Sequence, residues 1–298
     1  TVDVNKTLDS RPIADIGRGL QGAVAGVNIT IPTGEVGSDP LIKIRGQVGS
    51  ISGNNTPLIL LDNVEIPSIQ MVNPNDVQSI SVLKDAASSS IYGSKAAFGV
   101  ILITTKSGAQ SDKFEISYSN NFSWQDPAKK IEIGGIEALQ YTLDAQTNRR
   151  EPMPAGGFWR ISPESLEKAI EWQNLYGGKV KWNDPVVYGR DWFYDGKDKY
   201  GYRLYDGAKA MIKNWTPTMT HNLSVNGKSG KTSYNIGLGY LDQSGMSKTA
   251  KKDDFKRYNA SVSVTSEINK YITVRASSIY SDRNKRYPGI GNTTADPW

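Results

Sequence analysis

The sequence has 298 residues, with 35 Lys and Arg against 30 Asp and Glu, so its formal net charge is only +5. This charge is spread along the chain, which argues against a nucleic-acid partner. There is no cysteine and a single histidine, His221, which excludes disulfides, cysteine-bound metals and a thiol nucleophile. We therefore expect no cofactor, no metal site and no enzymatic activity. No apolar run is long enough for a transmembrane helix, which needs about 18 residues.

The first third of the chain, residues 1–108, has the pattern of a small α/β unit. Apolar residues between Ile13 and Val27 recur at three- and four-residue spacing, which predicts a short amphipathic helix after Pro12. An Ala/Ser-rich stretch at 85–90 predicts one or two helical turns. Short apolar runs bounded by turn residues predict strands at residues 27–31, 41–44, 58–61, 77–83 and 100–104.

From about residue 112 the period of the hydrophobic pattern changes to two. One face is apolar and aromatic, and the other is small and polar, in the segments 114–125, 219–226, 233–240, 258–265 and 272–281. These segments are longer than the strands of about 5–6 residues found in soluble sheets. A soluble β-sandwich also alternates. The polar faces carry few Lys or Glu residues, however, which favours the lumen of a transmembrane β-barrel, and aromatics gather near the strand ends.

The connections between these strands are alternately long and short. An insertion at about 125–217 comes first, followed by a turn at 227–230, a loop at 243–254 and a turn at 267–270. Outer-membrane barrels have long extracellular loops and short periplasmic turns. The sequence therefore predicts that the insertion lies outside the cell.

The insertion carries two predicted helices, at about 136–147 and 162–175. Ser162 is a suitable N-cap for the second, and Pro163 suits its first turn. Aromatic residues such as Trp192, Phe193 and Tyr202 follow. They either stack on a sugar or a partner protein, or pack the insertion onto its own helices.

The first third also carries motifs of a known family. The runs are LQGAVAGV at 20–27, IKIRG at 42–46, PLILLD at 57–62, NPNDVQSISVLKD at 73–85 and IYGSKAAFGVILITTK at 91–106. They resemble the plug domain of TonB-dependent outer-membrane transporters, and within that family the SusC-like branch of the Bacteroidetes. The motif YLDQSG at 240–245 is also similar to that branch.

The resemblance implies a fold and a function. It implies a plug domain at 1–108, inside a 22-stranded barrel whose N-terminal part is residues 109–298. It implies import of an oligosaccharide across the bacterial outer membrane, driven through TonB, which contacts a segment upstream of residue 1. It also implies a SusD-like surface lipoprotein as a lid and contact with outer-membrane lipid. Peptide cargo stays open, as does a non-transporting surface β-sheet binding module.

The resemblance also indicates site residues. Arg45 and Lys84 match basic plug residues that pair with carboxylates of the barrel wall, although either could be an ordinary solvated charge, and the family often has Arg-Gly where this chain has Lys84-Asp85. The plug loops at 32–40, 47–56 and 65–73 are predicted to face the substrate. Their polar candidates are Glu35, Asn54, Asn55, Glu65, Ser68 and Gln70.

The strand count bears on the length of the chain. About five barrel strands are an odd number and would leave two open sheet edges. We therefore expect these 298 residues to be a plug and roughly the first quarter of a barrel, with no signal peptide among them.

Overall fold

The computed structural model describes residues 2–3, 16–31, 35–44, 56–108, 112, 114–127, 134–148, 161–181, 183–197 and 199–287. The chain divides into two compact units. The first is Thr1–Asp126, Asn214–Met246 and Ala250–Trp298, and the second is Pro127–Lys213 with Ser247–Thr249. No helix in the described part of the chain is long and apolar enough to cross a membrane.

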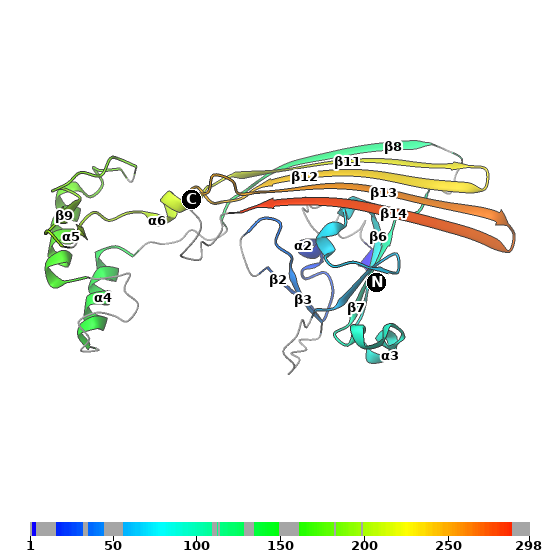
Figure 1. Cartoon of the computed structure of the whole chain (residues 1–298), viewed down its shortest axis with the longest axis horizontal. Helices are drawn as coiled ribbons and strands as arrows, with labels where there is room; N and C mark the ends of the chain where they lie inside the picture. Colours follow the sequence, from blue (N-terminus) through cyan, green and yellow to red (C-terminus); the bar gives the residue numbers. More distant parts are fainter. Residues whose placement is uncertain are drawn as a thin grey trace. The chain divides into compact units, whose positions relative to one another are not determined.

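The first unit begins with a small α/β domain, the plug (Figure 1). Its sheet has the order β1-β6-β7-β4-β5, in which β6 and β7 are antiparallel while β4 and β7 are parallel. The strands are β1 (Val2–Asp3), β4 (Leu58–Leu61), β5 (Val64–Glu65), β6 (Val77–Leu83) and β7 (Val100–Thr105). A separate hairpin pairs β2 (Val27–Thr30) with β3 (Leu41–Ile44), and α3 (Ala86–Ser89) continues into the 3-10 helix η3 (Ser90–Ala96). The five predicted plug strands are confirmed to within one residue.

The predicted amphipathic helix is shorter than its spacing indicated. Helix α2 covers only Ile16–Leu20, and Val27 already belongs to β2. The reason is local, because Gly22 and Gly26 both have φ of +76° and turn the chain out of the helix. Ile16 and Leu20 still enter the plug core with Ile42, Ile80 and other buried aliphatic side chains.

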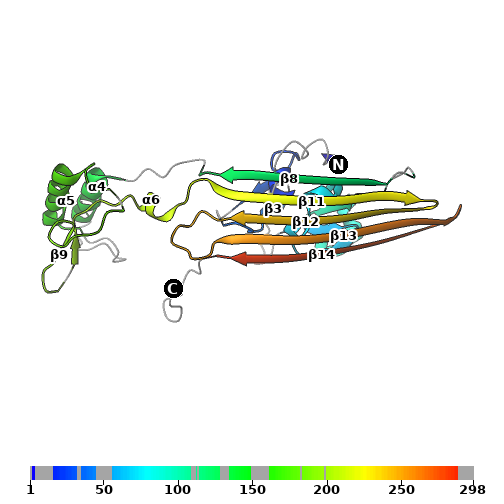
Figure 2. The same cartoon turned by 90° about the horizontal axis from the view of Figure 1, so that it is seen from above.

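Five long strands form the second part of this unit. They lie in the order β14-β13-β12-β11-β8, all antiparallel (Figure 2). Their bounds are β8 (Glu115–Gln125), β11 (Thr216–Ser229), β12 (Thr232–Ser244), β13 (Asp254–Asn269) and β14 (Ile272–Arg286). The strands run further than the alternation predicted, so the tight turns are at Gly230-Lys231 and Lys270-Tyr271. The connection at 245–253 is longer.

Exposure in this sheet is the reverse of that in a soluble sheet. On β12 and β13 the apolar face is open, with Leu238 48 % and Val262 43 % exposed. The polar face is covered by the plug, with Asn259 6 % and Ser261 7 % exposed. A soluble sandwich would bury the first set and expose the second. The polar face is therefore the interior face of the sheet.

The second unit is the insertion. It contains α4 (Ile136–Asn148), α5 (Pro163–Tyr176), α6 (Gly207–Met211) and a hairpin of β9 (Trp192–Tyr194) and β10 (Lys199–Gly201). Both predicted helices are confirmed to within one residue. Ser162 is the N-cap of α5, since its Oγ accepts a hydrogen bond from the Ser165 amide at 3.1 Å, and Pro163 occupies the first turn.

Candidate functional site

The plug meets the polar face of the sheet through a short segment, residues 68–76. It contains two 3-10 turns, η1 (Ile69–Met71) and η2 (Pro74–Asp76). Each turn is started by a side chain: Ser68 Oγ accepts from the Gln70 amide at 3.1 Å, and Asn73 Oδ1 accepts from the Asn75 amide at 3.2 Å. The caps satisfy these two amides within the segment, and the carbonyls of Gln70 and Met71 accept hydrogen bonds from the wall, the sheet of five long strands.

Strand β13 supplies three successive inward side chains to this segment. Arg257 Nη1 donates to the Gln70 carbonyl at 2.9 Å, and Asn259 Nδ2 donates to the Met71 carbonyl at 2.7 Å. Ser261 Oγ donates to Asp76 Oδ2 at 2.8 Å. The two-residue repeat of the strand thus matches the spacing of acceptors along the plug segment.

Two glycines of β12 allow this close approach. A Cβ atom at Gly237 would lie 2.5 Å from Asp76 Oδ1, and one at Gly239 would lie 2.5 Å from Asn73 Nδ2. Any side chain there would displace the carboxylate of Asp76 or the amide of Asn73 from its present position. The small residues seen in the sequence pattern therefore serve a specific purpose on this strand.

The segment also reaches β11 and β8. Asn73 Nδ2 donates to Asn222 Oδ1 at 3.0 Å, and Asn75 Nδ2 donates to Ser119 Oγ at 3.4 Å. We call the inward residues that contact segment 68–76 from these four strands the plug seat. Its members are Ser119, Asn222, Gly237, Gly239, Arg257, Asn259 and Ser261.

Strand β14 adds a row of cations beside the plug seat. Arg283 Nη1 donates to Ser68 Oγ at 2.9 Å, and Lys285 Nζ lies 2.9 Å from Glu35 Oε2. Arg275 Nη2 lies 3.8 Å from Asp62 Oδ2, whose carboxylate also accepts from the Thr105 amide and hydroxyl. In the described residues these wall groups are basic and their plug partners are acidic or neutral acceptors.

An apolar contact completes the interface. Phe255 packs with Val36 and Leu241, and its ring lies over Gly37, where a Cβ atom would come within 2.2 Å of the ring. Gly37 has φ of +68°, so glycine is required there for conformation as well as for space. Ile279 of β14 packs against the main plug core.

Two plug carboxyls are shifted by this environment. Burial raises the pKa of Asp76 above its ordinary value, while the Ser261 hydrogen bond and the charges of Lys106 and Arg257 act in the opposite direction. The hydrogen bond from Lys285 lowers the pKa of Glu35. Because the two pKa values shift in opposite directions, mutation can separate the contributions of Asp76 and Glu35 to the pH dependence of the interface.

The residues predicted from the plug loops divide into three groups. Glu35, Ser68 and Gln70 all take part in the contact with the sheet, and the last two are buried. Glu65 instead pairs with Lys95 of the plug at 2.6 Å. Asn54 and Asn55 lie outside the described residues, and contact of the six loop candidates with a substrate stays a prediction. Arg45 also lies outside the described residues, so its pairing with a carboxylate of the barrel wall stays a prediction.

The predicted basic residue Lys84 lies within the plug. Its Nζ donates to the Ala25 carbonyl, so in the described residues it joins two parts of the plug. Its pairing with a carboxylate of the wall stays a prediction. Sequence reasoning missed Asn73, Asp76, Arg257 and Arg283. The signal for the two arginines was a cation at an inward position of an alternating strand. No group of three or more Asp, Glu or His side chains in the described part of the chain could hold a metal ion.

Comparisons with known proteins agree with this geometry. The family model "TonB-dependent Receptor Plug Domain" matches residues 1–100. TonB-dependent receptor P26 of Formosa agariphila is 29% identical over 97% of this chain and 25% of its own length. TonB-dependent receptor SusC of Bacteroides thetaiotaomicron is 26% identical over 91% of this chain and 23% of its own. The chain thus spans about a quarter of these curated relatives.

Solved structures show the same fold. A structure of the RagAB peptide importer in the closed-closed state superposes with a TM-score of 0.70 at 28% identity, over 99% of this chain and 31% of the other. A plug seated on the polar face of an antiparallel sheet, with the apolar face exposed, is thus accompanied by similarity to TonB-dependent receptors in the plug domain and in the fold. Among these receptors the chain is similar to SusC and to the RagAB importer over a part that carries the plug and five long antiparallel strands.

Proposed function

We propose that this chain is the plug and first wall strands of an outer-membrane transporter that imports an oligosaccharide with energy delivered through TonB. The observation that carries the proposal is the plug seat. A polar wall held against a polar plug occludes a lumen, while the opposite apolar face suits contact with lipid. For cargo to pass, the plug must rearrange along this seat.

The proposal includes two protein partners. A SusD-like lipoprotein would cover the extracellular side, and TonB would supply energy from the inner membrane through a segment upstream of residue 1. The relatives named SusC and RagAB support this expectation. Affinity purification of the tagged transporter from outer membranes should recover the lipoprotein at a fixed ratio. Recovery of the transporter alone would contradict this part of the proposal.

The energy requirement is tested by uptake. Cells that produce the whole transporter should accumulate a labelled oligosaccharide, and a protonophore or loss of TonB should abolish accumulation without releasing the transporter from the membrane. Accumulation that continues without TonB would contradict energy coupling. Recovery of the protein in the aqueous fraction without detergent would instead favour a surface binding module.

Peptide import is the second candidate. It is favoured by the fold match to structures of a peptide importer, at 28% identity and a TM-score of 0.70. The two cargoes are separated by competition, in which unlabelled oligosaccharides or mixed short peptides are added to the uptake assay. Displacement of the label by peptides would favour the second candidate.

A further inference from the structure

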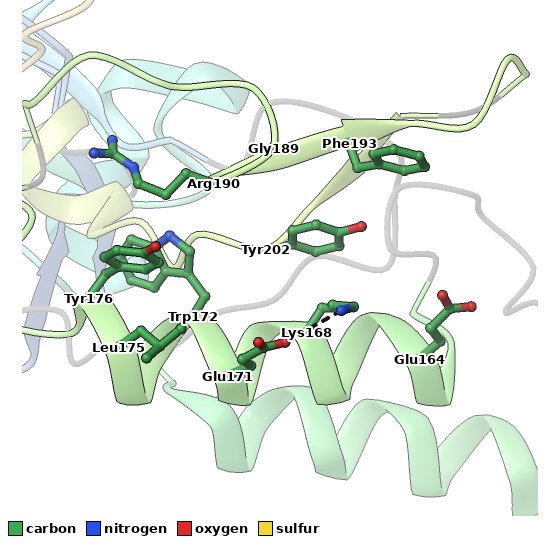
Figure 3. Close-up of a pocket in the computed structure, with 10 residues that line it drawn as sticks. All are labelled: Glu164, Lys168, Glu171, Trp172, Leu175, Tyr176, Gly189, Arg190, Phe193 and Tyr202. Carbon is green, nitrogen blue, oxygen red and sulfur yellow. Dashed lines mark hydrogen bonds and ion pairs between the residues drawn. The ribbon is translucent and has the colours of Figure 1, made fainter.

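The insertion contains a cleft that the plug and its seat do not use. Its volume is about 400 Å³, near the lower end of the range of about 300–1,000 Å³ that is typical of small-molecule sites. One wall is helix α5 and the other is the segment around hairpin β9–β10 (Figure 3). We propose that this cleft binds one or two rings of a neutral oligosaccharide outside the membrane.

The two walls differ in chemistry. Phe193 and Tyr202 come from the hairpin side, and Glu164, Lys168 and Glu171 come from one side of α5 (Figure 3). The helical residues are spaced by four and three positions, which places them in a single stripe. Lys168 Nζ and Glu171 Oε2 are 3.4 Å apart and both side chains are about half exposed, so they remain accessible to a ligand.

This combination fits a sugar. A pyranose ring has an apolar C–H face that packs on an aromatic ring, and hydroxyls at its edge that both donate and accept hydrogen bonds. Carboxylates accept and an ammonium group donates, so the α5 stripe can satisfy both roles. The lining carries both signs of charge, with Lys168 and Arg190 against Glu164 and Glu171, so its field selects neither an anion nor a cation. An extended peptide would instead be held by backbone hydrogen bonds to a strand edge.

The cleft is held by a buried network. Asp191 is 2 % exposed and accepts hydrogen bonds from the Trp172 indole at 2.9 Å and from the Val187 amide at 2.8 Å. It also accepts from Arg190 through both carboxylate oxygens, at 2.9 and 2.7 Å. Trp172 belongs to α5 and Arg190 precedes β9, so this carboxylate joins the two walls. A ligand would therefore meet a site that is already formed.

The inference rests on the proposed import of an oligosaccharide, and its test separates the two. Calorimetry on the full-length transporter in detergent would use neutral hexasaccharides of glucan, mannan and xylan as probes. Phe193→Ala should weaken binding of the preferred probe about tenfold, the effect of losing one well-placed aromatic anchor. Phe193 is 41 % exposed, so its truncation spares the core. Glu164→Gln, at an exposed helical position, should also weaken binding of the probe, and it leaves the shape of the cleft unchanged.

Tyr141→Ala is the matched control, because Tyr141 is an aromatic of the same unit that is 76 % exposed on α4 and does not line the cleft. Its affinity should equal that of the wild type. Wild-type affinity for the sugar in both Phe193→Ala and Glu164→Gln would overturn the inference and leave import standing. The same holds if these two variants lose the lipoprotein partner while their affinity for the sugar stays unchanged. Failure of the wild type to bind or import any probe would instead remove the proposed cargo.

Discussion

Gly237 offers the sharpest perturbation of the plug seat. In Gly237→Ala the new Cβ atom would lie 2.5 Å from both Asp76 Oδ1 and Ser261 Oγ, so the carboxylate must move and its 2.8 Å hydrogen bond is lost. Overpacking costs about 1–3 kcal/mol, and a hydrogen bond to a charged group contributes about 1.5–3 kcal/mol. Because one displacement causes both losses, we expect a total of about 2–4 kcal/mol. This corresponds to a roughly 30- to 700-fold increase in the equilibrium constant for release of the plug from its seat.

The strand itself should tolerate this change. Alanine is favoured over glycine within a strand by about 0.5–1 kcal/mol, so insertion of the barrel should be unaffected. The assay is the conductance of the full-length transporter in a planar bilayer, which should rise as the plug loosens. Ser263→Ala is the control, because Ser263 is a buried inward residue of β13 whose hydroxyl has no hydrogen-bond partner among the described residues. Equal conductance of Gly237→Ala, Ser263→Ala and wild type would refute the reasoning.

Three further predictions concern charged groups. Burial raises the pKa of Asp76. Its contribution to the stability of the plug on its seat is therefore fully present below the unfolded pKa of 3.8 and is lost as pH rises through the folded pKa. In Lys285→Met, which lacks the opposing Glu35 contact, conductance should therefore fall on acidification through this range, and adding Asp76→Asn should remove that dependence. If the conductance of this double variant still depended on pH in this range, the dependence would come from another group. Lys285 lowers the pKa of Glu35, so that contact contributes above pH 4.5 and is lost as pH falls through the folded pKa. Lys285→Met should abolish this loosening of the plug in acid. The pair stabilises the contact by under about 1 kcal/mol, because it is partly exposed. An unchanged response to acid in Lys285→Met would contradict the prediction. Asp191→Asn leaves Arg203 buried without its charge partner, and should destabilise the insertion by about 3–5 kcal/mol. Limited proteolysis should then cleave the insertion faster than in the exposed control Asp144→Asn, and equal cleavage rates would argue against the network.

Local patterns predicted the elements well, because their causes are local. Ser162 and Pro163 fixed the start of α5, and the two-residue alternation identified all five long strands. The helix after Pro12 was predicted too long because Gly22 and Gly26 interrupt an apolar spacing that otherwise continues. The apolar face of the strands was identified, but alternation alone did not separate a barrel from a sandwich. Exposure of residues such as Leu238 does.

The contacts of the site depend on register between distant segments. Arg257 and Gln70 are 187 residues apart in sequence, and no local signal pairs them. Lys84 shows the same difficulty, since its motif indicates the wall while its described contact is the Ala25 carbonyl. Asp191 in the insertion looked like one acidic residue among many. Its importance comes from Trp172, Arg190 and Arg203, which converge on it only after folding.

A reversible link across the plug seat tests the central claim most directly. The sequence has no cysteine, so Asp76→Cys with Ser261→Cys introduces a single pair where two polar atoms now lie 2.8 Å apart. Uptake of labelled oligosaccharide by cells carrying this transporter should stop when the pair is joined by oxidation or a short thiol cross-linker. It should resume when a disulfide is reduced, and each single substitution should transport throughout. Energy-dependent uptake at the wild-type rate with the link closed would contradict a plug that must leave this seat.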